Sequence, residues 1–172
     1  MIFIPMILVL LAAGLLQGLV PAVGLLGMAK APWFLSAVLY YALFHGRYAM
    51  LMAAFFGGLL HDSLGFTPLG CSSFCFCLTG LAVQAAREML FKDSILTLVG
   101  LTALFAVLLT LATWLFLAFG DFGAMPAMGV TGWGVWIKAA GTGLLAVIAA
   151  PLVFAMARGL DTLVGTGEYP PL

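Results

Sequence analysis

Long apolar segments separated by short polar, glycine- or proline-containing breaks make up almost the whole chain. Taken as loops, the breaks leave six apolar segments, at about residues 2–26, 32–45, 48–65, 69–86, 94–120 and 133–157. About 20 apolar residues in a helix suffice to cross the hydrocarbon core of a bilayer. The pattern therefore predicts an all-α integral membrane protein with about six transmembrane helices. We expect one polytopic domain over residues 1–172, of which residues 158–172 form a cytoplasmic tail.

Composition supports this class and excludes others. Hydrophobic residues make up 65% of the chain and charged residues 7%, and the mean hydropathy is +1.26. A soluble domain would lack the polar residues needed to cover its surface. The six basic and six acidic residues cancel, so the charge gives no support for a nucleic-acid partner. The spans leave no room for a soluble catalytic domain.

The second and third segments are short. They share residues 31–65, with the turn His45-Gly46-Arg47 between them. At 1.5 Å per residue each reaches about 21 to 27 Å, close to the minimum for a span. This predicts a tight helical hairpin with little tilt, or one that locally thins the bilayer.

Basic and aromatic residues predict the orientation, because cytoplasmic loops are enriched in Lys and Arg. Cytoplasmic termini put four basic residues inside, namely Arg47, Arg87, Lys92 and Arg158. Two lie outside, Lys30 and Lys138. The same frame gathers aromatic residues at each interface: Trp33, Trp133 and Trp136 outside, and Tyr40, Tyr41 and Tyr48 inside.

An acidic residue lies near the outer end of the third segment, in "GGLLHDSLGFTPLG", residues 57–70. A carboxylate at the bilayer centre costs about 2.5 to 3.5 kcal/mol, and somewhat less at this shallower depth. We expect Gly65 to end the third helix in a left-handed conformation and Pro68 to occupy the first turn of the next. The chain would then fold back, so that the free amide groups of the fourth helix hold the Asp62 carboxylate.

His61 precedes this acid. Adjacent positions on a helix point about 100° apart, so the sequence predicts no pairing between His61 and Asp62. A position facing the outer interface is favoured over a proton-relay role.

Two stretches resemble the MreD family, the membrane subunit of the bacterial rod-shape machinery: "KAPWFLSAVLYYALFHGR" and "FFGGLLHDSLGFTPLG". The family pattern has a Pro opening the second span, an "LY-x-AL" stretch, a basic turn, "G-x-x-x-D" and a later Leu-Gly. The matching residues here are Pro32, Tyr40, Arg47, Gly58, Asp62, Leu69 and Gly70. The resemblance is specific across about residues 30–90. The chain departs from it at His61, at Gly65, which falls one place early, and at "REMLFKD".

The resemblance implies a non-enzymatic scaffold in the bacterial cytoplasmic membrane, without cofactor or metal. It would bind MreC, a single-span periplasmic scaffold, and through it connect MreB filaments to peptidoglycan-synthesis enzymes. The family is also similar to the six-helix substrate-binding components of energy-coupling-factor transporters. That similarity leaves an alternative function, a substrate-binding membrane component of a vitamin-type transporter. The predicted outer side offers such a component few polar groups, namely His61, Asp62, Thr67, Asp121 and Lys138.

Small residues indicate close helix packing. The first segment contains Gly14-x-x-x-Gly18, with Gln17 beside it, and the third contains Gly57-Gly58. Packing within the chain is favoured for both groups, and a partner interface at Gly14, Gln17 and Gly18 is the alternative. The sequence leaves the oligomeric state and the partner-binding face open. An intramembrane enzyme is disfavoured, because no base lies beside the deep hydroxyl and thiol groups.

Overall fold

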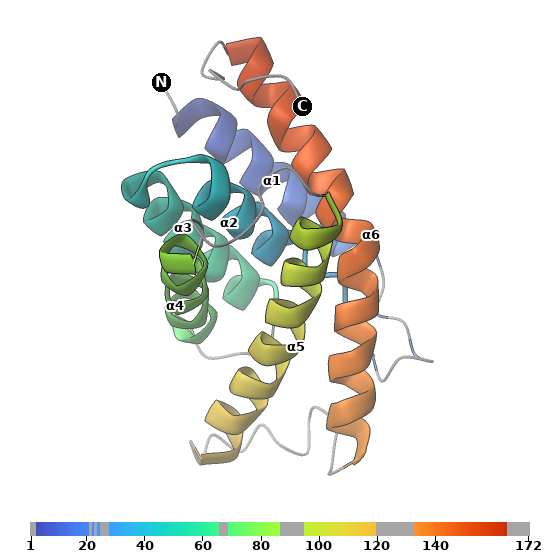
Figure 1. Ribbon diagram of the computed structural model, residues 1–172. Helices are drawn as coiled ribbons and strands as arrows, with labels where there is room; N and C mark the ends of the chain where they lie inside the picture. Colours follow the sequence, from blue (N-terminus) through green and yellow to red (C-terminus); the bar gives the residue numbers. More distant parts are fainter. Residues whose placement is uncertain are drawn as a thin grey trace.

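The computed structural model describes residues 3–20, 22, 24, 28–65, 69–86, 95–119 and 133–164. These residues form six helices, as the segment pattern predicts (Figure 1). In chain order they are α1 (Phe3–Leu19), α2 (Trp33–Phe44), α3 (Arg47–Ser63), α4 (Cys71–Ala86), α5 (Ile95–Phe119) and α6 (Trp133–Val164).

Helix α2 is the centre of the fold. It contacts all five of the other helices, and every residue from Trp33 to Leu43 is buried. Its sequence, "WFLSAVLYYALF", is apolar on all sides, which is typical of a helix surrounded by protein. Its twelve residues extend only about 18 Å. Because neighbouring helices enclose it, α2 has no need to reach both bilayer interfaces. It packs against α3 across the short turn at His45 and Gly46, in keeping with the predicted helical hairpin.

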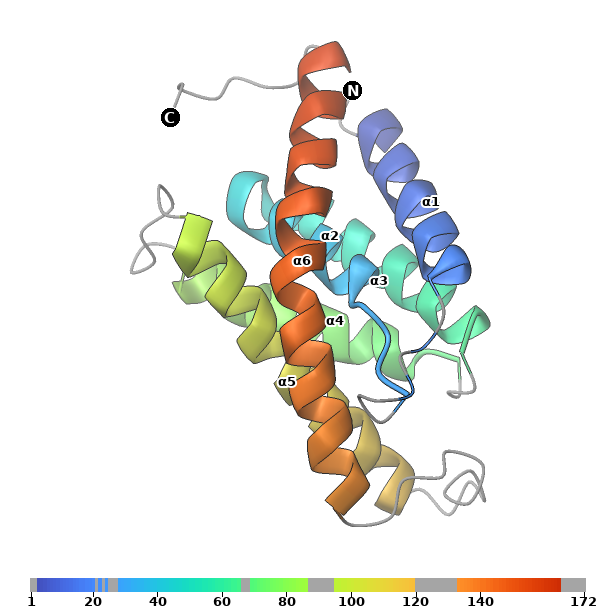
Figure 2. The same ribbon diagram turned by 90° about the vertical axis from the view of Figure 1, so that its right-hand side faces the viewer.

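Helices α5 and α6 are the longest and lie side by side. The end of α5 and the start of α6 extend beyond the other four helices (Figures 1 and 2). The hydroxyl oxygens of Thr110 and Thr142 lie 3.0 Å apart across this pair. Gly143 faces α5 so closely that an added Cβ would lie 2.8 Å from Val107 Cγ2. The pair is therefore closely packed through small and hydroxyl-bearing residues, as is common between membrane helices.

Within the described ranges, one helix is both long and apolar enough to cross a membrane, Trp133–Leu163, with a mean hydropathy of 2.0. The other apolar stretches are shorter: Phe3–Leu19, Trp33–Phe44, Cys71–Ala85 and Val99–Leu115. Helix α1 leaves large apolar side chains exposed along one face, namely Ile4, Ile7, Leu8, Leu11 and Leu15. An apolar exposed face of this kind is expected of a helix in contact with lipid or with a partner helix.

Two predicted boundaries change. Helix α1 ends at Leu19 rather than near residue 26, and several residues of that interval lie outside the described ranges. Helix α6 continues to Val164, beyond the predicted end of the sixth span at residue 157. The helix continues because Ala157 and Asp161 are buried and extend its inward face.

The aromatic residues differ from the predicted interface belts. Trp33, Tyr40 and Tyr41 are buried in the protein, whereas Tyr48 is exposed. The exposed Trp133 and Trp136 remain available to a membrane interface. The prediction failed for the buried three because they belong to α2, which has no lipid-facing side.

Candidate functional site

The junction between α3 and α4 differs in part from the loop chemistry predicted for it, which put the left-handed residue at Gly65. The amide of Leu64 donates to the Leu60 carbonyl at 3.1 Å, and the amide of Gly65 donates to the Asp62 carbonyl at 3.2 Å. These bonds close the last turn of α3. The left-handed residue that the structure shows in this junction is Gly70, with φ of +98°, immediately before α4. Pro68, the predicted first-turn proline, lies outside the described residues.

The Asp62 carboxyl group is held by the start of α4. Its side chain is almost fully buried, with 2% exposed. Oδ2 accepts hydrogen bonds from the amides of Gly70, at 2.8 Å, and Ser72, at 3.2 Å. The first amides of a helix lack partners inside the helix, and its amino-terminal dipole favours a negative group. This is the contact that the sequence predicts, and it explains why an acid occurs at the end of an apolar helix.

Glycine brings the two helix backbones together beside this carboxyl group. A Cβ added to Gly58 would lie 2.3 Å from Ser73 Cα and 2.4 Å from Ser73 N. The hydroxyl of Ser73 donates to the Phe55 carbonyl at 3.1 Å. Gly57 instead faces Leu10 of α1, 3.2 Å from the position of an added Cβ. The adjacent glycines therefore serve two internal interfaces, α3 with α4 and α3 with α1.

His61 belongs to the same network. Its Nδ1 lies 3.1 Å from Ser72 Oγ and 3.9 Å from Asp62 Oδ1. The ring also packs edge-on against Phe34 and Phe76. The predicted separation of His61 from Asp62 is therefore wrong in part: the side chains approach one another, although no direct hydrogen bond joins them. The histidine turns inward because its ring packs between two buried aromatic rings.

A second buried carboxyl group lies where the carboxyl end of α2 meets α6. Asp161 is 0% exposed, and its Oδ2 accepts a hydrogen bond of 2.6 Å from the Tyr40 hydroxyl. His45 Nε2 lies 3.6 Å from the same oxygen. Beside this cluster the Arg158 guanidinium lies over the Phe44 ring, 5.2 Å from its centroid. Asp161 is a site residue that the sequence prediction missed, although an acid that follows the apolar part of α6 is a visible signal.

A family model described as rod shape-determining protein MreD matches residues 1–158. The chain belongs to the MreD family. Neither a curated protein nor a solved structure matches it. MreD proteins are bacterial membrane proteins that take part in rod-shape determination, and the family is not known to be enzymatic.

The residues that carried the MreD resemblance do not form one site. Pro32 precedes α2, where its carbonyl accepts from the amide and hydroxyl of Ser36. Tyr40 binds Asp161 at one end of the molecule, and Gly58 and Asp62 lie at the other junction. Arg47 begins α3, and Leu69 is exposed. The MreD motif therefore specifies contacts of α2 and α3 with their neighbours.

The three residues of the predicted interface on α1, Gly14, Gln17 and Gly18, have different surroundings in the structure. Gly14 faces Phe34 of α2, 3.5 Å from the position of an added Cβ. Gln17 is buried, with 8% exposed. Gly18 has no atom within 4 Å of an added Cβ. Of these three described residues, Gly18 alone is open to another molecule, and a partner contact there remains a prediction.

Replacing Tyr40 with Phe tests the second junction. The change removes one hydrogen bond to a buried carboxyl group and keeps the aromatic ring, so we expect a loss of about 2 kcal/mol in the free energy of unfolding. Denaturation of the purified chain in detergent, followed by circular dichroism, measures this. Tyr48→Phe is the matched control because Tyr48 is exposed. Equal stability of the two variants would contradict an energetic role for the Tyr40–Asp161 contact.

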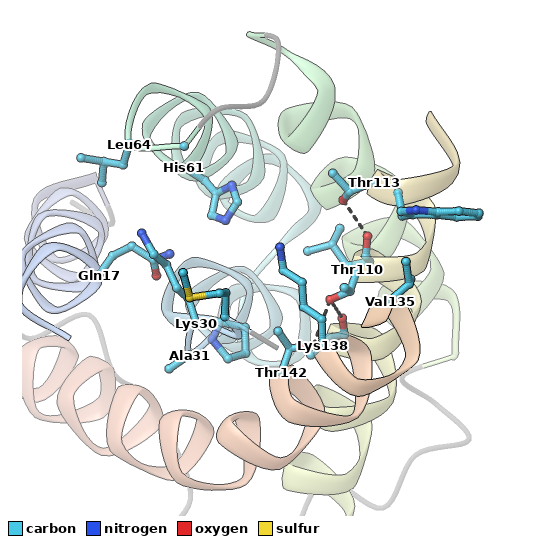
Figure 3. Close-up of a pocket in the computed structure, with 16 residues that line it drawn as sticks. Gln17, Lys30, Ala31, His61, Leu64, Thr110, Thr113, Val135, Lys138 and Thr142 are labelled. Carbon is cyan, nitrogen blue, oxygen red and sulfur yellow. Dashed lines mark hydrogen bonds between the residues drawn. The ribbon is translucent and has the colours of Figure 1, made fainter. Parts of the chain in front are cut away.

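A cavity of about 230 Å³ opens among α1, α3, α5, α6 and the segment that precedes α2. Gln17, His61 and Lys138 point into it from different sides, and Thr110, Thr113 and Thr142 lie along one wall (Figure 3). The remaining lining residues are Met28, Lys30, Ala31, Pro32, Leu64, Gly65, Ala106, Leu109, Trp114 and Val135. The sequence places Lys138 and His61 on the predicted outer side of the membrane. It gives no sign that Gln17 lines the same cavity.

Proposed function

We propose that this chain is a non-enzymatic scaffold of the bacterial cell-elongation machinery. In this role it binds the single-span protein MreC and, through it, connects MreB filaments to the enzymes of peptidoglycan synthesis. The match to the MreD family over residues 1–158 is the observation that carries the proposal. Residues 30–90, which carry the family motif, lie within this matched range.

The internal contacts suit a scaffold. Asp62 connects α3 to the start of α4, and Asp161 connects α6 to α2. Both carboxyl groups are buried, and both accept hydrogen bonds from a different helix. Contacts of this kind fix the relative positions of helices, so that the outer faces of the bundle keep a constant shape for a partner.

The proposed location is the cytoplasmic membrane, with both termini in the cytoplasm. This orientation follows from the basic residues of the sequence. It puts the Asp62 junction and the cavity near the outer leaflet and the Asp161 junction near the inner one. We further propose that the six helices are arranged as in the substrate-binding components of energy-coupling-factor transporters.

The proposed face for MreC lies on α1. Gly18 is open, and the apolar residues Ile4, Ile7, Leu8, Leu11 and Leu15 are exposed along the same helix. An open glycine lets a second transmembrane helix approach closely. This refines the predicted Gly14–Gly18 interface, because Gly14 packs against Phe34 and Gln17 is buried within the chain.

Co-purification in detergent tests this proposal. We expect the wild-type chain to retain MreC from the same bacterium and Gly18→Leu to retain severalfold less, because a large side chain blocks close helix approach. Gly100→Leu on α5 is the matched control, since an added Cβ there also meets no atom within 4 Å. Failure of the wild-type chain to retain MreC would contradict the scaffold. Recovery of a coupling ATPase complex instead would support the alternative, a transporter component.

A further inference from the structure

The cavity among α1, α3, α5 and α6 is positively charged. Two lysines, Lys30 and Lys138, and one histidine, His61, are among its lining residues, and none of the lining residues in the described part of the chain is acidic. Within the described ranges no carboxylate lies within 4.0 Å of either lysine. Like charges that face a partly enclosed space favour a bound anion between them.

A buried amide also lacks a partner in this cavity. Gln17 is 92% buried, and its Oε1 has no hydrogen-bond partner within the described part of the chain. Figure 3 shows its side chain directed toward the space that Lys138 and His61 also face. A buried carbonyl oxygen without a donor is uncommon, and each such atom calls for an explanation. A hydroxyl group on a bound ligand would supply the missing donor.

The other polar groups of the wall are already occupied. Thr110 donates to the Ala106 carbonyl and Thr113 to the Leu109 carbonyl, at 2.8 and 2.7 Å. Thr142 donates to the Ala139 carbonyl at 2.9 Å. Their hydroxyl oxygens can still accept, but the ammonium groups and Gln17 Oε1 carry the unsatisfied charge and hydrogen-bonding capacity. The cavity therefore selects for negative charge and for a hydroxyl donor.

We propose that this cavity binds a phosphate ester that carries a free hydroxyl group. Lys30 and Lys138 would neutralise the phosphate, and Gln17 would accept from the hydroxyl. A space of about 230 Å³ suits a group of this size and not the acyl chains of a whole lipid. The apolar residues Leu109, Trp114 and Val135 also line the cavity, and they suit the carbon skeleton that joins the phosphate to the hydroxyl group. This ligand site goes beyond the proposed scaffold role and stands independently of MreC binding.

Two sources supply this chemistry, a phospholipid headgroup and a soluble organophosphate. Native mass spectrometry of the full-length chain in detergent distinguishes them. One arm titrates phosphatidylglycerol against phosphatidylcholine with the same acyl chains, and the other titrates glycerol 3-phosphate. We expect phosphatidylglycerol to bind at least tenfold more tightly than phosphatidylcholine. Binding of glycerol 3-phosphate as well would show that the headgroup suffices, and its absence would assign the site to a lipid.

Three variants locate the binding. Lys138→Gln should weaken binding of the phosphate ester at least tenfold, and Lys138→Arg should restore it because the positive charge returns. Arg47→Gln removes an equal charge from an exposed position outside the cavity and should leave the affinity unchanged. If Lys138→Gln fails to fold, Lys30→Gln provides the same comparison. Equal affinity of wild type and the lysine variants, or no preference for phosphatidylglycerol, would overturn the proposal.

Discussion

Replacing Asp62 with Ala is expected to lower the free energy of unfolding by about 3 kcal/mol. The change removes the acceptor of two amide groups, those of Gly70 and Ser72. Both donors lie at a buried helix start, so the penalty is that of leaving them unsatisfied as well as of losing the bonds. Denaturant titration in detergent micelles, followed by circular dichroism, measures the effect.

Two further variants test whether the carboxylate itself causes this loss of stability. Asp62→Asn keeps an oxygen acceptor but not a carboxylate, so about half of the loss is expected because hydrogen bonds to a neutral acceptor are weaker. Ser63→Ala is the neighbouring control. Its hydroxyl is exposed and bonds only within α3, and a surface change of this kind alters stability by about 0.5 kcal/mol or less. If Asp62→Ala were no more destabilising than Ser63→Ala, the carboxyl group would not be needed to join α3 to α4.

The Asp62 contact could be predicted because its partners are close in sequence. Gly70 and Ser72 follow the acid by eight and ten residues, and the intervening turn limits where the chain can go. Glycine and proline signals, helix-end chemistry and the cost of a buried carboxylate all indicate the same geometry. The details of the turn were less predictable. The structure shows the left-handed conformation at Gly70, eight residues beyond the acid.

The Asp161 contact could not be predicted in the same way. Tyr40 and Asp161 are 121 residues apart, and no local pattern determines which helices pack together. A sequence read one segment at a time also assigns Tyr40 and Tyr41 to a membrane interface, because tyrosine is common there. Their burial depends on α2 being surrounded by other helices, which is a property of the whole bundle. The cavity could not be predicted for the same reason. Its lining residues come from several segments that are far apart in the sequence.

Replacing Gly58 with Ala is expected to cost about 3 kcal/mol in the free energy of unfolding. The new Cβ would lie 2.3 Å from the Cα of Ser73. This neighbour is backbone, so a side-chain rotation cannot relieve the clash, and α3 and α4 must separate. Separation would also stretch the bond from Ser73 to the Phe55 carbonyl. The same detergent denaturation experiment measures the loss.

Gly80→Ala is the matched control for this clash. An added Cβ at Gly80 would lie 2.5 Å from Met50 Sδ, almost as close as the contact at Gly58. The neighbour here is a flexible thioether that can adopt another rotamer, so a loss of about 1 kcal/mol is expected. Gly18→Ala meets nothing within 4 Å and should not destabilise the chain. Equal losses of unfolding free energy in the Gly58 and Gly80 variants would contradict the prediction that a clash with backbone costs more than a clash with a flexible side chain.

Combining Gly58→Ala with Asp62→Ala shows whether the close approach and the carboxyl contact form one unit. Asp62 reaches the amides of α4 only while the two helices remain close. Gly58→Ala should therefore already weaken the bonds that Asp62→Ala removes. We expect the double variant to be more stable than the sum of the single losses implies, by about 1 kcal/mol or more. Additive losses would mean that the glycine contact and the buried acid stabilise α3 and α4 independently, and that the MreD motif joins two separate features.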